Sequence, residues 1–213
     1  MQFNGLLENV ANEPLFETGL LLAGDVDPDD VRRQLSRWTK AGRLYQLRRG
    51  LYALAPPYQK VLPHPFVVAN RLVPASYVSL QSALAFHSLI PEFVPLTTSV
   101  TGTRASKWET PLGVYAFRHL KSVYLYGYQL TDLGRGQQAL VATPEKALLD
   151  LAYLQPGGDE LDYLSELRLQ NLERLDLDVL RHLVERADKP ILRRAAANVV
   201  RLVEAEAKEY QLL

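Results

Sequence analysis

The chain has 213 residues, of which 47% are hydrophobic and 23% charged. These proportions are typical of folded globular proteins and exclude a disordered or collagen-like chain. The length allows one large domain or two small ones. Because 24 Lys and Arg balance 24 Asp and Glu, net charge predicts neither nucleic-acid nor membrane affinity. Any partner must therefore be inferred from local charge.

Cysteine is absent, which excludes disulfides, thiolate metal sites and a cysteine nucleophile. No apolar run approaches the roughly 20 residues that a membrane-spanning helix needs. We therefore expect a cytoplasmic protein that has no contact with membranes.

Charge is strongly segregated near the N-terminus. Residues 1–30 contain seven acidic residues and no basic one, whereas residues 31–50 contain seven basic residues and no acidic one. Such a run is often only the solvated face of a helix. The positions of the basic residues must decide between that interpretation and a binding surface.

The basic run begins on a predicted helix. Val31, Leu35, Trp38 and Ala41 recur at spacings of four and three, which places them on one helix face. The preceding Asp27-Pro28 pair suits an N-cap followed by a first-turn proline, and we expect the helix to end at Gly42. The opposite face carries Arg33, Arg37 and Lys40, flanked by Arg32 and Ser36. This stripe is a candidate recognition surface.

A short hairpin is predicted after this helix, over residues 44–54, with a doubly basic turn at Arg48-Arg49-Gly50. Two shorter helices are predicted before it, over 3–10 and 15–22. Three helices followed by a basic hairpin are typical of a winged helix-turn-helix, whose recognition helix enters the major groove. A winged helix that contacts only proteins remains the alternative.

The roles of the basic residues follow from their chemistry. Arginine can bond guanine O6 and N7 in a bidentate manner, whereas a cation at the wing neutralises phosphate. We assign base or near-base contacts to Arg33 and Arg37, with Arg32 as a further candidate, and phosphate contacts to the cations from Lys40 onward. The predicted DNA-binding residues are Arg32, Arg33, Ser36, Arg37, Lys40, Arg43, Arg48 and Arg49.

Four prolines mark a predicted linker over residues 56–65, which separates a winged-helix domain (1–55) from a C-terminal domain (66–213). The second domain is predicted to be α+β, with a small antiparallel sheet and a helical tail. Its predicted strands are 96–101, 112–118, 123–130 and 138–142. Its predicted helices are 65–72, 79–89, one that begins at Thr143-Pro144-Glu145, and then 161–172, 178–187 and 190–210.

No catalytic, metal-binding or cofactor-binding residue is predicted, and we expect no enzymatic activity. Asp25, Asp27 and Asp29 imitate half of a calcium loop, but a glycine and a final acidic ligand are missing. The four histidines are never at ligand spacing, and nucleotide-binding and nucleophile motifs are absent. We expect His87 to be a hydrogen-bonded core residue. A salt-bridged helix end explains Glu145, Lys146 and Asp150 as well as a functional site would.

Three patches of the sequence resemble AbiEi-type antitoxins, the regulator half of an abortive-infection toxin-antitoxin pair. The patches are Gly42–Leu44 with Arg48–Tyr52, Tyr77–Leu84 with His87 and Ile90-Pro91, and Ala142–Asp150. The resemblance spans most of the chain, although the last fifty residues match only as a helical region.

This resemblance implies a winged helix that represses its own operon by binding inverted repeats. Palindromic operators usually imply two copies bound with two-fold symmetry, which makes a homodimer on the DNA a candidate assembly. It also implies a C-terminal domain that counteracts a nucleotidyltransferase toxin encoded beside it, with or without direct contact. No cofactor is implied. The alternative from a different class is an interaction module that neutralises a partner by docking, without specific DNA binding.

Overall fold

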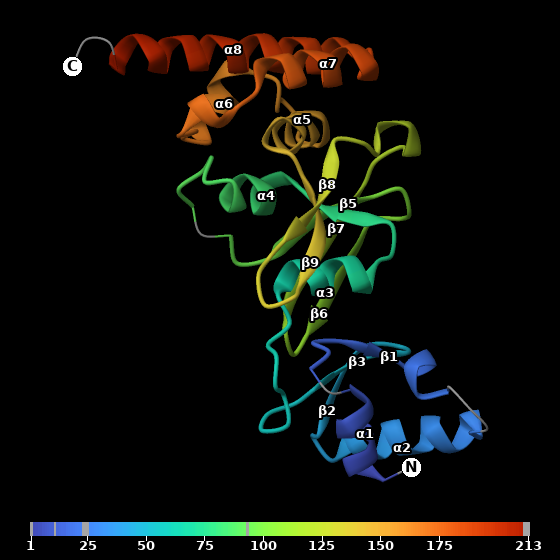
Figure 1. The fold of residues 1–213 in the computed structure, drawn as a ribbon. Coiled ribbons are helices and arrows are strands. Elements are labelled where there is room, and N and C mark those ends of the chain that lie inside the picture. Colours follow the sequence, from blue (N-terminus) through green and yellow to red (C-terminus); the bar gives the residue numbers. More distant parts are fainter. Residues whose placement is uncertain (1, 11, 23–25, 93, 211–213) are drawn as a thin grey trace.

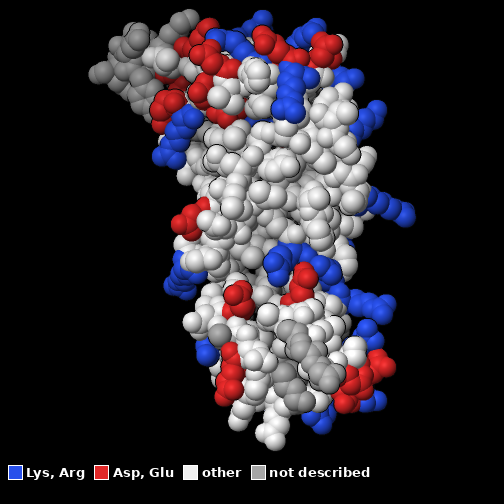
Figure 2. Space-filling view, turned by 45° about the vertical axis from the view of Figure 1, so that its right-hand side comes forward, with Lys and Arg blue, Asp and Glu red and all other residues white. Residues whose placement is uncertain are grey.

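A computed structural model describes residues 2–10, 12–22, 26–92 and 94–210, with side chains as far as residue 207. The N-terminal elements lie at one end of the molecule, a sheet lies in the middle, and a layer of helices lies at the other end (Figure 1). On the face shown in Figure 2, charged side chains gather at the two ends and the middle is largely uncharged. Within the described ranges, no helix is long and apolar enough to cross a membrane.

The N-terminal elements are helices and a small antiparallel sheet in the strand order β1-β3-β2. Their bounds are α1 Phe3–Val10, β1 Phe16–Glu17, the 3-10 helix η1 Thr18–Leu22, α2 Pro28–Lys40, β2 Leu44–Arg48 and β3 Leu51–Leu54. The α-helix expected over 15–22 is wrong in its first part. Phe16 and Glu17 pair instead with Tyr52 and Leu51, because the edge of β3 offers them backbone partners and Phe16 stacks on Tyr52.

The start of α2 follows from its capping residue. Asp27 precedes the helix, and its carboxylate accepts a 2.9 Å hydrogen bond from the Asp29 amide. Pro28 occupies the first turn, where a backbone N–H would have no acceptor within the helix, so the N–H that proline lacks is not missed. The helix ends before Gly42, whose φ of 69° belongs to the left-handed region that glycine adopts without strain.

Replacing Asp27 by Ala is expected to lower the free energy of unfolding by about 1 kcal/mol, because the Asp29 amide loses its acceptor. Asp27→Asn keeps an acceptor at the same place and is expected to lose much less. Urea denaturation of the two variants and the wild type checks this. Equal midpoints for Asp27→Ala and the wild type would contradict the capping role.

The C-terminal part contains a six-stranded sheet in the order β6-β7-β5-β4-β9-β8. Its strands are β4 Ser76–Val78, β5 Thr97–Thr101, β6 Ser106–Thr110, β7 Gly113–His119, β8 Tyr128–Asp132 and β9 Gln138–Ala142. The predicted antiparallel sheet is wrong in two respects. The sheet is mixed, because β5 pairs with β7 and β4 with β9 in parallel, and strands β4 and β6 were not predicted. The predicted strand 123–130 begins too early, because residues 122–124 form a 3-10 turn and only residues 128–130 of it belong to β8.

Eight α-helices in all are described, and those of the C-terminal part are arranged in layers around the sheet (Figure 1). They are α3 Pro65–Leu72, α4 Leu80–Phe86, α5 Pro144–Leu154, α6 Leu161–Glu166, α7 Leu177–Ala187 and α8 Pro190–Tyr210, with 3-10 turns η2 Ser122–Tyr124 and η3 Leu172–Arg174. Helix α3 packs against β4 and β9, α4 packs against α5, and α5 is covered by α7 and α8. The α+β class and the helical tail are therefore confirmed.

Two hydrophobic clusters hold the molecule together. The smaller one joins α1, α2 and one side of the N-terminal sheet, with Leu6, Leu35 and Trp38 among its buried members. The larger one fills the C-terminal part and also takes in Leu47 and Leu51 of the N-terminal hairpin. The two parts of the chain therefore pack against each other, and the domain boundary at 56–65 stays a prediction.

Candidate nucleic-acid interface

The outer face of α2 carries the predicted recognition residues. Val31, Leu35 and Trp38 are buried in the smaller core, which fixes the rotation of the helix about its axis. The opposite side of the helix therefore points outward. The exposed residues of this face are Arg32, Arg33, Ser36, Arg37 and Lys40. The structure thus brings five of the eight predicted residues onto one surface.

The first two arginines of this face are paired with acidic residues of the first helical turn. Arg32 donates to Asp29 at 2.8 Å, and Arg33 donates to Asp30, which raises the pKa of Arg33. Both pairs are well exposed to solvent. Exposed pairs of this kind contribute little to stability, so these guanidinium groups can exchange their carboxylates for another acceptor.

The second half of the helix has a different electrostatic character. Arg37 and Lys40 are exposed and have no ion pair with any residue that the structure describes. They lie three positions apart and therefore on the same side of the helix. The uncompensated positive charge of α2 is concentrated at this end.

The remaining three predicted residues lie outside α2. Arg43 is exposed and its guanidinium lies 4.9 Å from the ring centre of Phe3 in α1. Arg49 is exposed at the turn between β2 and β3 and has no ion pair among the described residues. These two side chains are accessible to a ligand.

Arg48 is directed into the molecule. Its Nε donates to the carbonyl of Arg71 at 3.1 Å, and a terminal nitrogen lies 3.5 Å from the carboxylate of Glu17. Its side chain is 25% exposed. Arg48 therefore attaches the hairpin turn to α3. A phosphate contact by Arg48 would require these bonds to break, and it stays a prediction.

A buried polar cluster lies between the six-stranded sheet and α5, on the side of the sheet away from α2 (Figure 1). Asp150 and Lys146 form an ion pair at 2.5 Å although their side chains are only 2% and 5% exposed. The Asp150 carboxylate also accepts hydrogen bonds from Tyr77 at 2.9 Å and Ser79 at 2.8 Å. Burial raises the pKa of Asp150, and these three donors oppose that effect.

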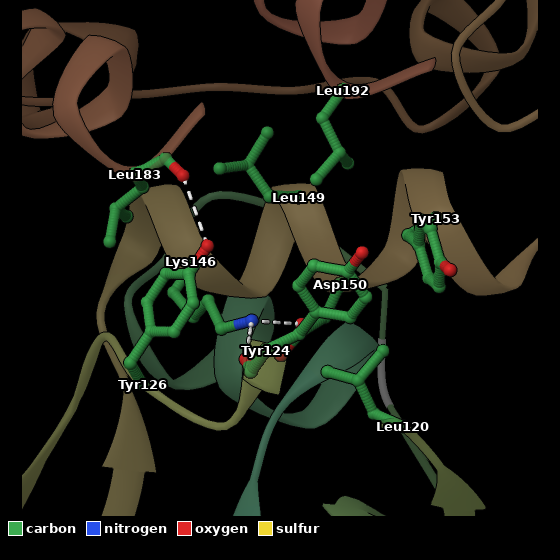
Figure 3. Close-up of a pocket in the computed structure, with 9 residues that line it drawn as sticks. All are labelled: Leu120, Tyr124, Tyr126, Lys146, Leu149, Asp150, Tyr153, Leu183 and Leu192. Atoms are coloured by element: carbon green, nitrogen blue, oxygen red, sulfur yellow. Dashed lines mark hydrogen bonds and ion pairs between the residues drawn. The ribbon is translucent and has the colours of Figure 1, made fainter. Parts of the chain in front are cut away.

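Lys146 is enclosed on its remaining sides. Its ammonium donates to the carbonyl of Tyr124 at 2.9 Å and lies 5.0 Å from the ring centre of Tyr126 (Figure 3). The adjoining cavity measures about 10 Å³, which is room for a single water molecule. The cluster therefore joins the sheet to α5 and offers no space for a substrate.

Sequence analysis anticipated the cluster in part. The salt bridge expected for Lys146 and Asp150 is confirmed, but it is buried and not at an exposed helix end. Glu145 is also buried and accepts a hydrogen bond from the Asp176 amide at 2.9 Å. His87 is hydrogen-bonded as expected, to the carbonyl of Ala142 at 2.8 Å, although it is only half-buried.

The buried tyrosines predict a loss of stability at alkaline pH. Burial raises the pKa of Tyr115 to about 12 and raises that of Tyr77 as well. The native state therefore keeps both phenolic protons above about pH 10, where the unfolded chain releases them, so stability falls as pH rises. The part of the phenolate absorbance that belongs to Tyr115 and Tyr77 is expected to appear together with the loss of the circular dichroism signal. Ionisation of all tyrosines before any unfolding would contradict this.

Metal coordination receives no support in the described part of the chain, where no group of three His, Cys, Asp or Glu residues converges. Asp25, which belongs to the imitated calcium loop, lies outside the described residues. Asp27 serves as the N-cap of α2.

Comparison with known proteins gives a fold relationship. No family model matches the chain, and no curated protein matches it in sequence. A solved structure, the RV2827C protein from Mycobacterium tuberculosis, is similar with a TM-score of 0.50 and 17% sequence identity. The similarity covers 91% of this chain and 78% of that one. At this identity it supports a shared α+β architecture.

Proposed function

We propose that this protein is a DNA-binding repressor of its own operon and the antitoxin of a neighbouring nucleotidyltransferase toxin. The observation that carries the DNA-binding part is the outer face of α2. Its apolar side is fixed in the core, while its other side presents five exposed polar residues, of which Arg37 and Lys40 lack an acidic partner among the described residues.

The arrangement around α2 favours this interpretation. The elements α1, β1, η1, α2, β2 and β3 follow one another in the order of a winged helix, with β1 paired to β3. In such a fold η1 and α2 form the helix-turn-helix, and α2 enters the major groove. Arg43 lies beyond the end of α2 and Arg49 lies at the hairpin turn, where each is accessible to a phosphate.

Base contacts are assigned to Arg33 and Arg37 of α2, with Arg32 as a further candidate. The ion pairs of Arg32 and Arg33 are exposed and readily exchanged. Arginine can then bond guanine, while a freed carboxylate can accept from the amino group of cytosine. Phosphate contacts are assigned to Lys40, Arg43 and Arg49.

The antitoxin part of the proposal depends on the sequence resemblance. Two of its patches meet in the buried cluster, where Tyr77 and Ser79 of one bond Asp150 of the other. These residues therefore stabilise the C-terminal fold and do not themselves form a surface for a toxin. We place the residues that counteract the toxin on the surface of the C-terminal part.

The test is binding of the purified chain to the DNA upstream of its gene, followed by fluorescence anisotropy at several salt concentrations. Unlabelled unrelated DNA serves as competitor. We expect specific binding, with log affinity falling against log salt at a slope of roughly −4 to −6, which corresponds to about five to seven phosphate contacts. Affinity no higher for this DNA than for the competitor would contradict the proposal.

A further inference from the structure

Strand β8 forms an open edge of the six-stranded sheet (Figure 1). Among the described residues it pairs with β9 alone. Its apolar side chains are unusually accessible, with Leu130 61% and Tyr128 39% exposed. Open edges with exposed apolar residues are ready templates for pairing with another strand.

The register of the β8–β9 pair defines which backbone groups are free. Hydrogen bonds from Thr143 to the Gly127 carbonyl and from Leu133 to the Gln137 carbonyl place the bonded pairs at odd-numbered positions of β8. Antiparallel bonding alternates along a strand. The N–H and C=O groups of Tyr128, Leu130 and Asp132 therefore point away from β9.

Bonds on the far side of β9 agree with this alternation. The Leu140 amide donates to Asn70 at 2.6 Å, and the Ala142 carbonyl bonds His87 at 2.8 Å. Both even-numbered residues of β9 thus face away from β8. No described residue bonds the outward backbone groups of β8.

The opposite edge of the sheet is protected. Strand β6 carries Lys107 and Glu109, which pair with each other at 2.8 Å on its surface. Charged side chains of this kind discourage pairing between sheet edges. Strand β8 has neither Lys nor Pro, and its one charge is Asp132 at its end.

We propose that β8 is the self-association site of this protein and pairs antiparallel with β8 of a second copy. With Leu130 on the two-fold axis, the three outward N–H groups of each copy would make six hydrogen bonds. Leu130 packs against the same residue of the second copy. Tyr128, whose ring stacks on Tyr77 of β4 at 4.5 Å, comes opposite Asp132 of the second copy.

A second copy fits this edge better than a strand of different composition. The residue pattern of β8 is complementary to itself about Leu130, because its hydroxyl donor and its carboxylate lie two positions to either side. A two-fold pair also leaves neither β8 edge open. This inference does not depend on the proposed function, since it concerns a surface remote from α2.

Amide hydrogen exchange of the full chain, measured by NMR at low and high protein concentration without DNA, tests the register directly. We expect exchange of the Tyr128, Leu130 and Asp132 amides to slow at least about tenfold in the dimer. The Gln129 and Thr131 amides, already bonded to β9, serve as internal controls and are expected to change little. Concentration-independent exchange of the three outward amides would overturn the proposal.

Two variants of Leu130 complete the test by sedimentation equilibrium. Leu130→Lys places two like charges on the two-fold axis and is expected to raise the dimer dissociation constant at least about tenfold. Leu130→Pro removes an outward donor that β9 does not use, so the sheet itself can accept it. Val123→Lys, at a residue 70% exposed outside β8, is the matched control.

Three results would overturn the proposal. One is a wild-type chain that is monomeric at every soluble concentration, and a second is a dimer that both Leu130 variants leave intact. The third is protection of the outward amides only when a different protein is added, which would assign the edge to that partner.

Discussion

Replacing Arg37 and Lys40 by Ala together is expected to weaken specific DNA binding by roughly ten- to a thousandfold. Both side chains are exposed on α2, and no acidic residue in the described part of the chain forms an ion pair that compensates their charge. The loss should also make the plot of log affinity against log salt shallower, by about 0.9 for each phosphate contact removed. Fluorescence anisotropy on the upstream DNA and on a scrambled sequence measures both effects.

The single variants separate the two roles. Arg37→Ala is expected to reduce the preference for the specific sequence, whereas Lys40→Ala should weaken binding to both DNAs and lower the slope. Arg193→Ala, which removes an exposed arginine of α8 paired with Asp188, is the control for a general loss of charge. Unchanged affinity in the double variant, or an equal loss in Arg193→Ala, would contradict the assignment to α2.

The position of α2 could be predicted because its signals are local. An aspartate cap, a first-turn proline and an apolar stripe at helical spacing all lie within residues 27–41. These features also fix which face points outward, so the exposed recognition residues followed from the sequence. The hydrogen-bond partners of Arg48 could not be predicted in the same way. The hydrogen bond from Arg48 to the Arg71 carbonyl joins positions 23 residues apart, and it depends on how α3 packs against the hairpin.

The sheet was harder to predict for the same reason. Strand β9 was predicted with its correct bounds because its turn signals are close in sequence. The parallel pairing of β4 with β9, however, joins Val78 to Val141, and no local pattern encodes such a distant partner. Strand β4 has only three residues, all buried, and continues directly into α4, so it lacks the alternation typical of a half-exposed strand.

The buried cluster illustrates a pattern that sequence analysis can underestimate. Lys146 and Asp150 are four positions apart, which usually indicates an exposed ion pair on a helix. Here the flanking residues Ala147, Leu148, Leu149 and Leu151 are also buried. Helix α5 is therefore covered on most of its sides, and the charged residues must satisfy each other inside the protein.

Removing either member of this pair is expected to lower the free energy of unfolding by about 3–5 kcal/mol, because its partner remains as an uncompensated buried charge. Asp150→Asn leaves the ammonium of Lys146 with two uncharged oxygen acceptors, the Tyr124 carbonyl and the new side-chain amide, and without a negative charge to compensate it. Lys146→Met leaves a carboxylate that still accepts from Tyr77 and Ser79. The combined variant Lys146→Met, Asp150→Asn removes both charges and should be less destabilised than the sum of the single losses.

The pH dependence distinguishes the two single variants. Burial raises the pKa of Asp150, and without Lys146 the main opposing charge is absent. In Lys146→Met the native state therefore binds a proton at a higher pH than the unfolded chain does. The stability that this carboxyl contributes is fully present below about pH 4, the pKa of an unfolded aspartate, and is lost as pH rises through the native pKa. The defect of Lys146→Met relative to the wild type should shrink on acidification, whereas Asp150→Asn has no carboxyl there to titrate.

Urea denaturation of the wild type, both single variants and the combined variant, at neutral and mildly acidic pH, measures these differences as a double-mutant cycle. Lys107→Met at the exposed pair with Glu109 is the matched control and is expected to change the midpoint little, because water and salt screen that pair. Additive losses in the cycle would show that Lys146 and Asp150 act independently, and a pH-independent defect in Lys146→Met would show that the carboxyl stays ionised without its partner. Coupling together with the acidic recovery would instead show that Lys146 and Asp150 act as one buried charge pair between the sheet and α5.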